Sequence, residues 1–327
     1  MANIVNNATF YGKTWDEMMK QFFVSNITAG KGLVTPLLGV KGREHLPFLT
    51  QTLNIRERDC AFTAGGVVTM DEKIINTVTY TDQTEFCKPD LIKFFDQAGL
   101  FEVTPGIPGI AEQVINYAVA QRLEKLKSNW DNILWNSNTA LAADPLTGIN
   151  LQDGYTKLIN AGSPIPAALT PAVVTVNNVV AMFESIVEVM PEVFQQAVQT
   201  GDRGLYIATS FTINTLLWQA LQAIPISQWG AFERKDYVSP NGAVFTNVWW
   251  VQGVPIIPIP NFRANTAFLV HHDIMFMGTD IDSEDMYIKT LDMENQDLSP
   301  KIRFSMGWVF GMQIGNQSDL FVEFYLP

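Results

Sequence analysis

Residues 301–314 read KIRFSMGWVFGMQI and carry the clearest periodicity in the chain. Large apolar side chains stand at every second position of this stretch: Ile302, Phe304, Met306, Trp308, Phe310, Met312 and Ile314. This alternation predicts a long β-strand with one face buried. At about 3.4 Å per residue, the strand spans roughly 45 Å.

The longest uninterrupted helix candidate in the chain, residues 108–136, has a similar length. Pro108 suits the first helical position, because the N–H that it lacks has no partner there in any helix. An apolar stripe with spacings of three and four predicts a packing face: Val119, Leu123, Leu126, Trp130 and Ile133. At about 1.5 Å per residue the helix runs roughly 40 Å. We therefore expect the helix and the strand to lie along each other, so that the middle and the C-terminal end of the chain form one elongated lobe.

Residues 46–88 are rich in strand-forming residues and threonine, which predicts a β structure. The polar cluster Asp71–Lys73 indicates a turn, and folding about it brings Cys60 near Cys87. These cysteines could form a redox pair, but two free thiols are the simpler interpretation. Because an isolated two-stranded ribbon is marginal in water, we expect this one to pack on a partner.

Residues 1–45 consist of short pieces between glycines, and we expect them to form an arm that lies on another surface. Gly12, Lys13 and Thr14 resemble the end of a phosphate-binding loop, but position 7 is Asn where that motif needs Gly. Thr14 is better explained as the cap of a helix over residues 15–24.

Helices alternating with strands predict a mixed α/β lobe over residues 145–280. A helical stretch over 174–199 contains Pro191, which should break or kink it. After the long C-terminal strand, we expect a turn at 315–319 and a strand at 320–326 that pairs back on it. The other predicted elements are a short helix near 151–162, a strand at 204–209, a capped helix from Ser210 to Ala223, a long loop over 224–243, and strands at 243–251, 254–260 and 265–272.

Length and composition bound the class of protein. The chain has 327 residues, more than one core usually accommodates, so two lobes are expected. With 47% hydrophobic and 17% charged residues, it is not a disordered protein. The net charge of −12 argues against a duplex-binding module, since such binding neutralises phosphates, but not against a container for nucleic acid.

Compartment signals are few. Two cysteines exclude a disulfide-built secreted scaffold. The N-terminus lacks the pattern of a signal peptide, and no apolar run reaches about 18 residues. We therefore expect a protein of the reducing cytoplasm that spans no membrane.

No catalytic, cofactor-binding or metal-binding set is predicted. The histidines are His45, His271 and His272. The last two are adjacent in a predicted strand, so their side chains should point to opposite faces. Surface or edge histidines are therefore a simpler interpretation than a metal site.

One carboxylate cluster, Asp280, Asp282, Glu284 and Asp285, could hold a divalent ion weakly between subunits. A calcium loop needs Gly and Glu at its sixth and twelfth positions, where this chain has Asp285 and Leu291. A solvated acidic turn is therefore the simpler interpretation.

With this order laid out, the chain resembles the major capsid proteins of tailed bacteriophages. The likeness covers most of the chain and is architectural, because this family has no short invariant signature to match. It is carried by CAFTAGGVVTMDEKIINTVTYTDQTEFC (60–87), IAEQVINYAVAQRLEKLKSNWDNILWNSN (110–138), LYIATSFTINTLLWQAL (205–221) and WWVQGVPIIPIPNF (249–262), which precede the C-terminal strand pair.

The resemblance implies the α+β fold of phage major capsid proteins, in four parts. These are an N-terminal arm (1–45), an extended β loop (46–88), a peripheral domain with a long spine helix and long strands (89–144 and 281–327), and an inserted mixed α/β axial domain (145–280). The loop 224–243 would sit toward the capsomer axis. Some relatives cross-link a loop lysine to a neighbour's asparagine, but no partner can be assigned to Lys73, so this chemistry is not carried over.

The resemblance also implies a function. The protein would be a non-enzymatic major capsid protein that self-assembles as hexamers and pentamers into an icosahedral shell around viral DNA. Its partners would be other copies of itself, scaffold and portal proteins, and double-stranded DNA bound on the inner face without sequence specificity. It would be made and assembled in the bacterial host cytoplasm and reside in the virion capsid, with no cofactor.

Two alternatives remain open. A bacterial nanocompartment shell of the encapsulin type uses the same fold to hold cargo enzymes, and would co-purify with cargo instead of nucleic acid. A two-lobed hydrolase or ligand-binding enzyme with a pocket between the lobes would lose activity on replacement of His271 or Asp282.

Overall fold

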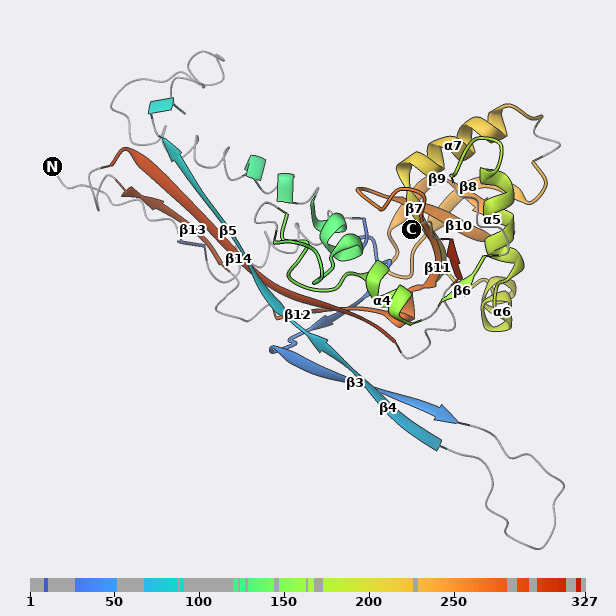
Figure 1. Cartoon of the computed structure of the whole chain (residues 1–327), viewed down its shortest axis with the longest axis horizontal. Coiled ribbons are helices and arrows are strands. Elements are labelled where there is room, and N and C mark those ends of the chain that lie inside the picture. Colours follow the sequence, from blue (N-terminus) through green and yellow to red (C-terminus); the bar gives the residue numbers. More distant parts are fainter. Residues whose placement is uncertain are drawn as a thin grey trace, which may run out of the picture.

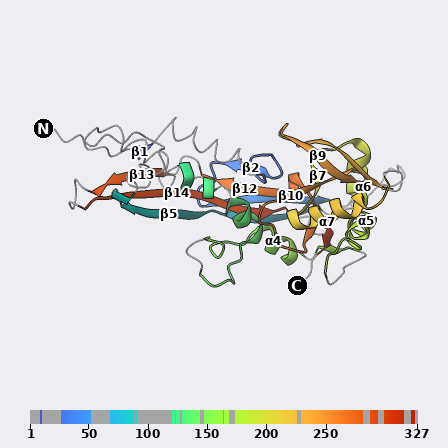
Figure 2. The same cartoon turned by 90° about the horizontal axis from the view of Figure 1, so that it is seen from above.

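The computed structural model shows an elongated molecule with an α/β part at one end and a β-ribbon that projects from its middle (Figure 1). Seen from above, the molecule is much thinner than it is long (Figure 2). The structure describes residues 9–10, 27–51, 68–87, 89–90, 120–122, 124–126, 129–143, 147–162, 164–167, 173–225, 229–280, 287–293, 299–315 and 322–324.

The first sheet is built around β14 (Lys301–Ile314), whose bounds agree with the strand predicted from the alternating pattern. β5 (Val78–Cys87) runs antiparallel along one edge of β14. β13 (Tyr287–Asp292) and β12 (Met275–Thr279) share the other edge in succession. β2 (Thr35–Leu38) extends the sheet beside β12, and β1 (Thr9–Phe10) extends it beside β13.

Burial along β14 changes halfway. Its first residues alternate between exposed and buried, as the sequence predicts, but the residues from Met306 to Met312 are buried on both faces. The second face is covered where Ile75 and Asn76 cross the strand at Gly311. The long strand is therefore buried on one face at its beginning and on both faces farther along.

The spine helix packs on β14, as its length predicts. Its described residues, 120–122, 124–126 and 129–136, are helical. The Trp130 ring lies 4.4 Å from that of Phe310 and 6.5 Å from that of Trp308, measured between centroids. The spine helix from the middle of the chain and β14 from its C-terminal end thus share one core. α4 (Tyr155–Ala161) also contributes to this core.

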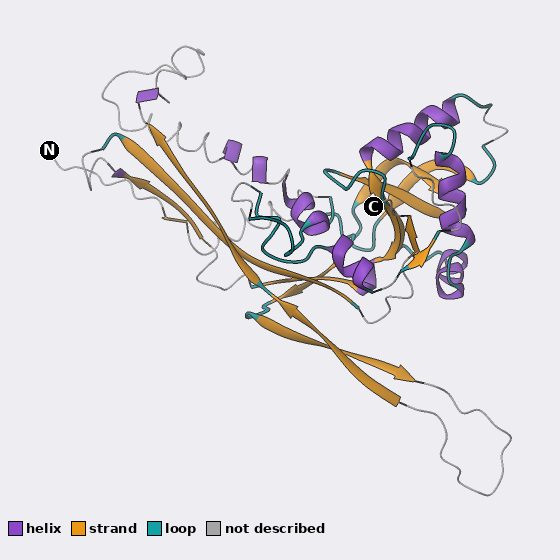
Figure 3. Ribbon diagram, viewed as in Figure 1, coloured by secondary structure: helices purple, strands orange, loops and turns teal. Residues whose placement is uncertain are grey.

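The second sheet has seven strands in the order β6-β15-β11-β7-β10-β9-β8. Its helices gather at the end of the molecule away from β13 (Figure 3). Pro191 is the N-cap of α6, so the predicted helix break is confirmed. The Ser210 hydroxyl accepts the Ile213 N–H at 3.2 Å, so the predicted cap of α7 is confirmed too. The bounds are β6 (Ile165–Pro166), β7 (Leu205–Ser210), β8 (Phe232–Val238), β9 (Val244–Val251), β10 (Val254–Ile259), β11 (Ala267–His271), β15 (Val322–Phe324), α5 (Val179–Glu188), α6 (Glu192–Thr200), α7 (Phe211–Gln222) and η2 (His272–Ile274).

The projecting ribbon pairs β3 (Arg43–Gln51) with β4 (Val68–Asn76), and here the sequence prediction was wrong. Asp71–Lys73 is no turn: it lies inside β4, because its polar side chains occupy an exposed strand. The next strand, β5, belongs to the first sheet, whereas residues up to 88 had been expected in the extended loop.

Two further predictions were wrong. The C-terminal strand β15 pairs with β11 and β6 in the second sheet and not with β14. The segment 224–243, predicted as a loop, contains β8, which pairs with β9. The helix predicted at 15–24 and the beginning of the spine helix lie outside the described residues.

Candidate assembly surfaces and pockets

The ribbon crosses the first sheet over a glycine pair, Gly278 of β12 and Gly311 of β14, which are opposite each other in the ladder. A Cβ on Gly311 would lie 2.3 Å from the carbonyl oxygen of Asn76, and one on Gly278 would lie 3.0 Å from Ile75. Ile75 is fully buried. The small size of both glycines therefore lets the ribbon's root rest directly on the sheet.

Polar contacts fix the ribbon beyond the glycine pair. The Lys73 ammonium donates to the Gly315 carbonyl at 3.2 Å, and the Gln313 amide donates to the Ile74 carbonyl at 2.8 Å. Burial lowers the pKa of Lys73, although the nearby Asp71 carboxylate opposes this shift. Lys73 is thus an anchor of the ribbon, and not the turn residue that the sequence predicted.

Beyond these contacts, the half-buried Phe48 ring lies 6.5 Å from that of Phe276, measured between centroids, and most other described side chains of the ribbon are exposed. Met70 is 80% exposed, although it is a large apolar residue. His45 and Glu72 form an exposed cross-strand pair at 3.0 Å. Within the described chain, β3 and β4 form a sheet only with each other. A two-stranded ribbon of this kind is only marginally stable alone in water, so contact with another surface would stabilise it.

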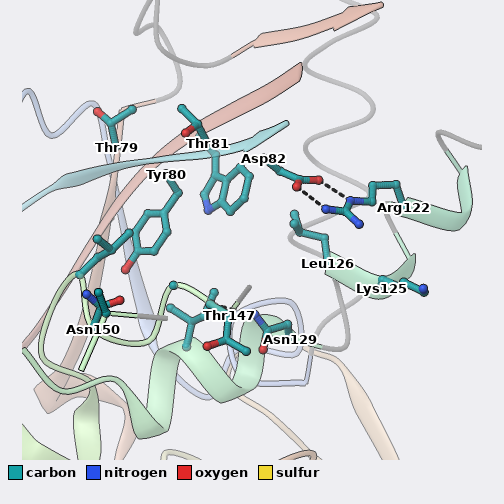
Figure 4. Close-up of a pocket in the computed structure, with 15 residues that line it drawn as sticks. Thr79, Tyr80, Thr81, Asp82, Arg122, Lys125, Leu126, Asn129, Thr147 and Asn150 are labelled. Carbon is teal, nitrogen blue, oxygen red and sulfur yellow. Dashed lines mark hydrogen bonds and ion pairs between the residues drawn. The ribbon is translucent and has the colours of Figure 1, made fainter. Parts of the chain in front are cut away.

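A pocket of about 680 Å³ lies between the spine helix, β5 and the segment that precedes α4 (Figure 4). Arg122 of the helix forms a bidentate ion pair with Asp82 of β5, with both N–O distances at 2.5 Å. The hydrogen bonds to Asp82 raise the pKa of Arg122, so the guanidinium stays charged. The ion pair therefore links the spine helix to β5 of the first sheet. On the opposite wall, the Asn129 amide donates to the Thr147 carbonyl at 2.9 Å.

The described lining of this pocket contains no histidine, cysteine or serine. Trp308 lines it, and the indole N–H of Trp308 has no acceptor within the described structure. The described lining thus lacks a Ser–His or Cys–His pair.

Asp131 of the spine helix ties down the segment at 27–34. Its two carboxylate oxygens accept the backbone N–H groups of Thr28 at 3.0 Å and Ile27 at 3.3 Å. The Trp135 indole N–H donates to the Thr28 hydroxyl at 2.9 Å. Burial raises the pKa of Asp131, although these hydrogen bonds act against the shift. Leu33 is fully buried, so this segment, predicted as an arm, is part of the core.

His271 and His272 lie close together, contrary to the prediction that they face opposite ways. β11 ends at His271 and a 3-10 turn begins, which brings the ring centroids to 5.9 Å. With Asp273 they form a group whose ligand atoms could hold a metal ion.

Hydrogen bonds already occupy the His271 ring, however. Its Nε2 lies 3.1 Å from Asp202 Oδ2, and its Nδ1 accepts the Asp273 N–H at 3.2 Å. Hydrogen bonds from Gly204 and His271 lower the pKa of Asp202 despite partial burial, and burial lowers that of His272. The group is best explained as a hydrogen-bonded corner of the second sheet.

The other residues singled out in the sequence are placed only in part. Asp280 ends the β12 segment and is buried, whereas Asp282, Glu284 and Asp285 lie outside the described residues. Cys87 is a half-buried free thiol, and Cys60 lies outside the described residues, as does the Gly12–Thr14 segment. The divalent site and the redox pair therefore stay untested.

The fold is that of tailed-phage major capsid proteins. A structure of Gordonia phage Cozz matches with a TM-score of 0.51 and 13% identity, over 90% of this chain and 85% of that one. The satellite phage P4 procapsid that includes the size determination (Sid) protein matches with a TM-score of 0.52 and 10% identity, over 95% and 99%. The cyanophage A-1(L) capsid asymmetric unit matches with a TM-score of 0.51 and 13% identity, over 89% and 90%.

At these identities the likeness shows the fold alone. No protein-family model and no curated protein sequence matches the chain. Within the described residues, no helix is both long and apolar enough to cross a membrane.

Proposed function

We propose that this chain is the major capsid protein of a tailed bacteriophage, which self-assembles as hexamers and pentamers into an icosahedral shell around double-stranded DNA. The observation that carries the proposal is the projecting ribbon on a capsid fold. In the described part of the chain, β3 and β4 contact the body of the subunit at the root and through Phe48, and they present Met70 and the His45–Glu72 pair outward. A strap of this kind is useful when it lies on a neighbouring copy.

Repetition by symmetry fits this geometry. Ordering a free ribbon costs conformational entropy, about 1–2 kcal/mol per residue for the backbone. Contacts with a neighbour can offset that loss, and symmetry repeats the gain at every interface of a closed shell. The ribbon thus favours an assembling subunit over a free monomer.

The division into parts is proposed on the same basis. The arm (1–45), the extended loop (46–88), the peripheral domain (89–144 and 281–327) and the axial domain (145–280) remain our assignment. With these bounds the first sheet draws strands from all four parts: β1 and β2 from the arm, β5 from the extended loop, β12 from the axial domain, and β13 and β14 from the peripheral domain. The partners would be scaffold and portal proteins, and DNA held without sequence specificity. The site of function would be the virion capsid, after synthesis in the host cytoplasm.

The proposal is tested by expressing the chain in bacteria, alone and with candidate scaffold proteins from its own genome, and by sedimenting the lysate. Particles of megadalton size that contain this chain are expected. Nuclease-protected DNA or phage proteins in the particles would support a phage capsid, whereas one co-packaged enzyme would indicate a nanocompartment. A chain that stays monomeric under all these conditions would contradict both.

A further inference from the structure

A second pocket, of about 310 Å³, lies between the arm segment, β8, β9 and the first turns of α7. Lys31 comes from the arm segment and Arg234 from β8. Their charged groups rest on aromatic rings that line the same pocket. The pocket therefore combines two cations from distant parts of the chain.

Each cation is held in place by a ring face. The Arg234 guanidinium carbon lies 4.3 Å from the centre of the Trp218 ring and 5.5 Å from that of Trp249. The Lys31 nitrogen lies 4.5 Å from the centre of the Phe245 ring. Contacts of this kind attract a cation but do not neutralise it. Both charges therefore remain available to an anion.

No carboxylate within the described structure neutralises them. Neither Lys31 nor Arg234 forms an ion pair there, and the described lining contains no Asp or Glu. The two acidic neighbours on β8 are engaged elsewhere. Glu233 pairs with Lys235, and Asp236 accepts the Asn247 N–H at 2.7 Å. In a chain with a net charge of −12, two cations without a carboxylate form an unusual site.

Contacts of the backbone on both sides of Lys31 fix the position of this residue. Asp131 binds the backbone of Ile27 and Thr28, a few residues before it. Gly32, directly after it, has φ at 71° and lies so close to Asn241 that an added Cβ would come within 2.4 Å of the amide nitrogen. The lysine is thus held between the spine helix and the second lobe before any ligand arrives.

We propose that this pocket receives a carboxylate side chain from a second copy of the chain, an inference that rests on the proposed function. Neighbours in a shell of identical subunits carry 33 acidic against 21 basic residues, so carboxylates are the commonest charged groups that they can offer. Arg234 donates its Nε–H to the Asn247 carbonyl at 3.0 Å. Its terminal NH₂ groups can then bind a carboxylate with little further loss of side-chain freedom.

Single-stranded nucleic acid fits less well. Single-stranded binding depends on aromatic faces on which bases can stack. Here Arg234 covers Trp218 and Trp249, and Lys31 covers Phe245. A base could stack only by displacing the cations that would bind its phosphate.

The first test compares the double variant Lys31→Gln, Arg234→Gln with the matched control Lys235→Gln. Lys235 follows Arg234 on β8 but lies over Trp250, 4.2 Å from the ring centre, outside the described lining of the pocket. We expect the double variant to need at least tenfold more subunit than the unmodified chain to form particles, and the control to assemble normally. Normal assembly of the double variant overturns the inference and leaves the proposed function standing.

Cross-linking keeps the inference testable if the double variant misfolds. Shells assembled from a mixture of ¹⁴N- and ¹⁵N-labelled subunits are treated with a water-soluble carbodiimide, and the amide-linked peptides are identified by mass spectrometry. Mixed-isotope peptides that join Lys31 to an Asp or Glu of another copy are expected. Lys31 linked only within its own chain, or Trp218 photo-cross-linked to packaged nucleic acid, overturns the inference. Absence of any particle overturns it together with the proposed function.

Discussion

The carbonyl oxygen of Asn76 passes directly over Gly311, so that a Cβ added to this glycine would lie 2.3 Å from it. The ribbon leaves the body of the subunit at this close contact between Asn76 and Gly311. It lies beside Gly278, whose added Cβ would meet Ile75 at 3.0 Å. The direction of the ribbon is therefore set by backbone packing on the first sheet.

Replacing Gly311 with alanine should force the ribbon's root away from the sheet. We expect Gly311→Ala to lower the free energy of unfolding by about 1–3 kcal/mol, as overpacking usually does, and to impair assembly. Urea unfolding of the free subunit measures the first effect and sedimentation the second. Gly315→Ala is the control, because the nearest atoms to its added Cβ are at an ordinary 3.5 Å. Equal stability and assembly in both variants would contradict this account of the root.

Removal of the outer ribbon separates folding from assembly. Deleting residues 47–72 with a short turn in their place keeps Lys73, Ile74 and Ile75, which hold the root. We expect the shortened chain to keep its circular dichroism spectrum and cooperative melting, but to sediment as free subunits. Intact shells from this deletion would show that the ribbon is no strap between copies.

Trp130 tests the packing of the spine helix on β14. Its side chain is 1% exposed, and its ring centroid lies 4.4 Å from that of Phe310. Trp130→Ala should therefore lower the free energy of unfolding by about 3–5 kcal/mol. Leu141→Ala is the control, because Leu141 is 43% exposed and should change it by less than about 0.5 kcal/mol. Near-normal urea unfolding of the tryptophan variant would place this residue outside the core.

Asp131 predicts a pH dependence of stability. Burial raises the pKa of Asp131 in the folded state. Between the unfolded and the folded pKa, the folded chain therefore holds a proton there that the unfolded chain has released. Its contribution to stability is therefore present at low pH and is lost as the pH rises through the raised pKa. We expect Asp131→Asn to remove this fall in urea-unfolding measurements across the acidic range.

Asp153 gives the opposite sign as a control. Hydrogen bonds from Lys157 and Thr139 lower its pKa despite partial burial, so its contribution is present above the unfolded pKa and lost as the pH falls through the folded pKa. Identical pH slopes for Asp131→Asn and the unmodified chain would contradict the assignment.

Much of the fold could be predicted because it rests on strong periodicity. The apolar residues that alternate through 301–314 are all buried, and so are Trp130 and Ile133 in the described part of the spine helix. The caps and breaks at Pro191 and Ser210 are local, so they too are readable from the sequence. Long-range pairing is different, because it depends on which surfaces meet.

The errors fall where local chemistry is ambiguous. Asp71–Lys73 has the composition of a turn, but on a ribbon open to solvent a strand carries the same residues. β8 exposes four successive charged residues, Glu233, Arg234, Lys235 and Asp236. This run of charges has the composition of a loop, so the strand could not be predicted from it. The carboxylate-free pocket could not be predicted either, because Lys31 and Arg234 are brought together only by the tertiary fold.

We propose that this chain builds a closed shell in which the ribbon of one subunit lies on its neighbour. A cryo-electron microscopy reconstruction of the particles formed on expression tests this arrangement. We expect an icosahedral particle in which β3 and β4 of each copy contact an adjacent copy. Particles whose ribbon folds back on its own subunit, or an expressed chain that forms no particles, would contradict it.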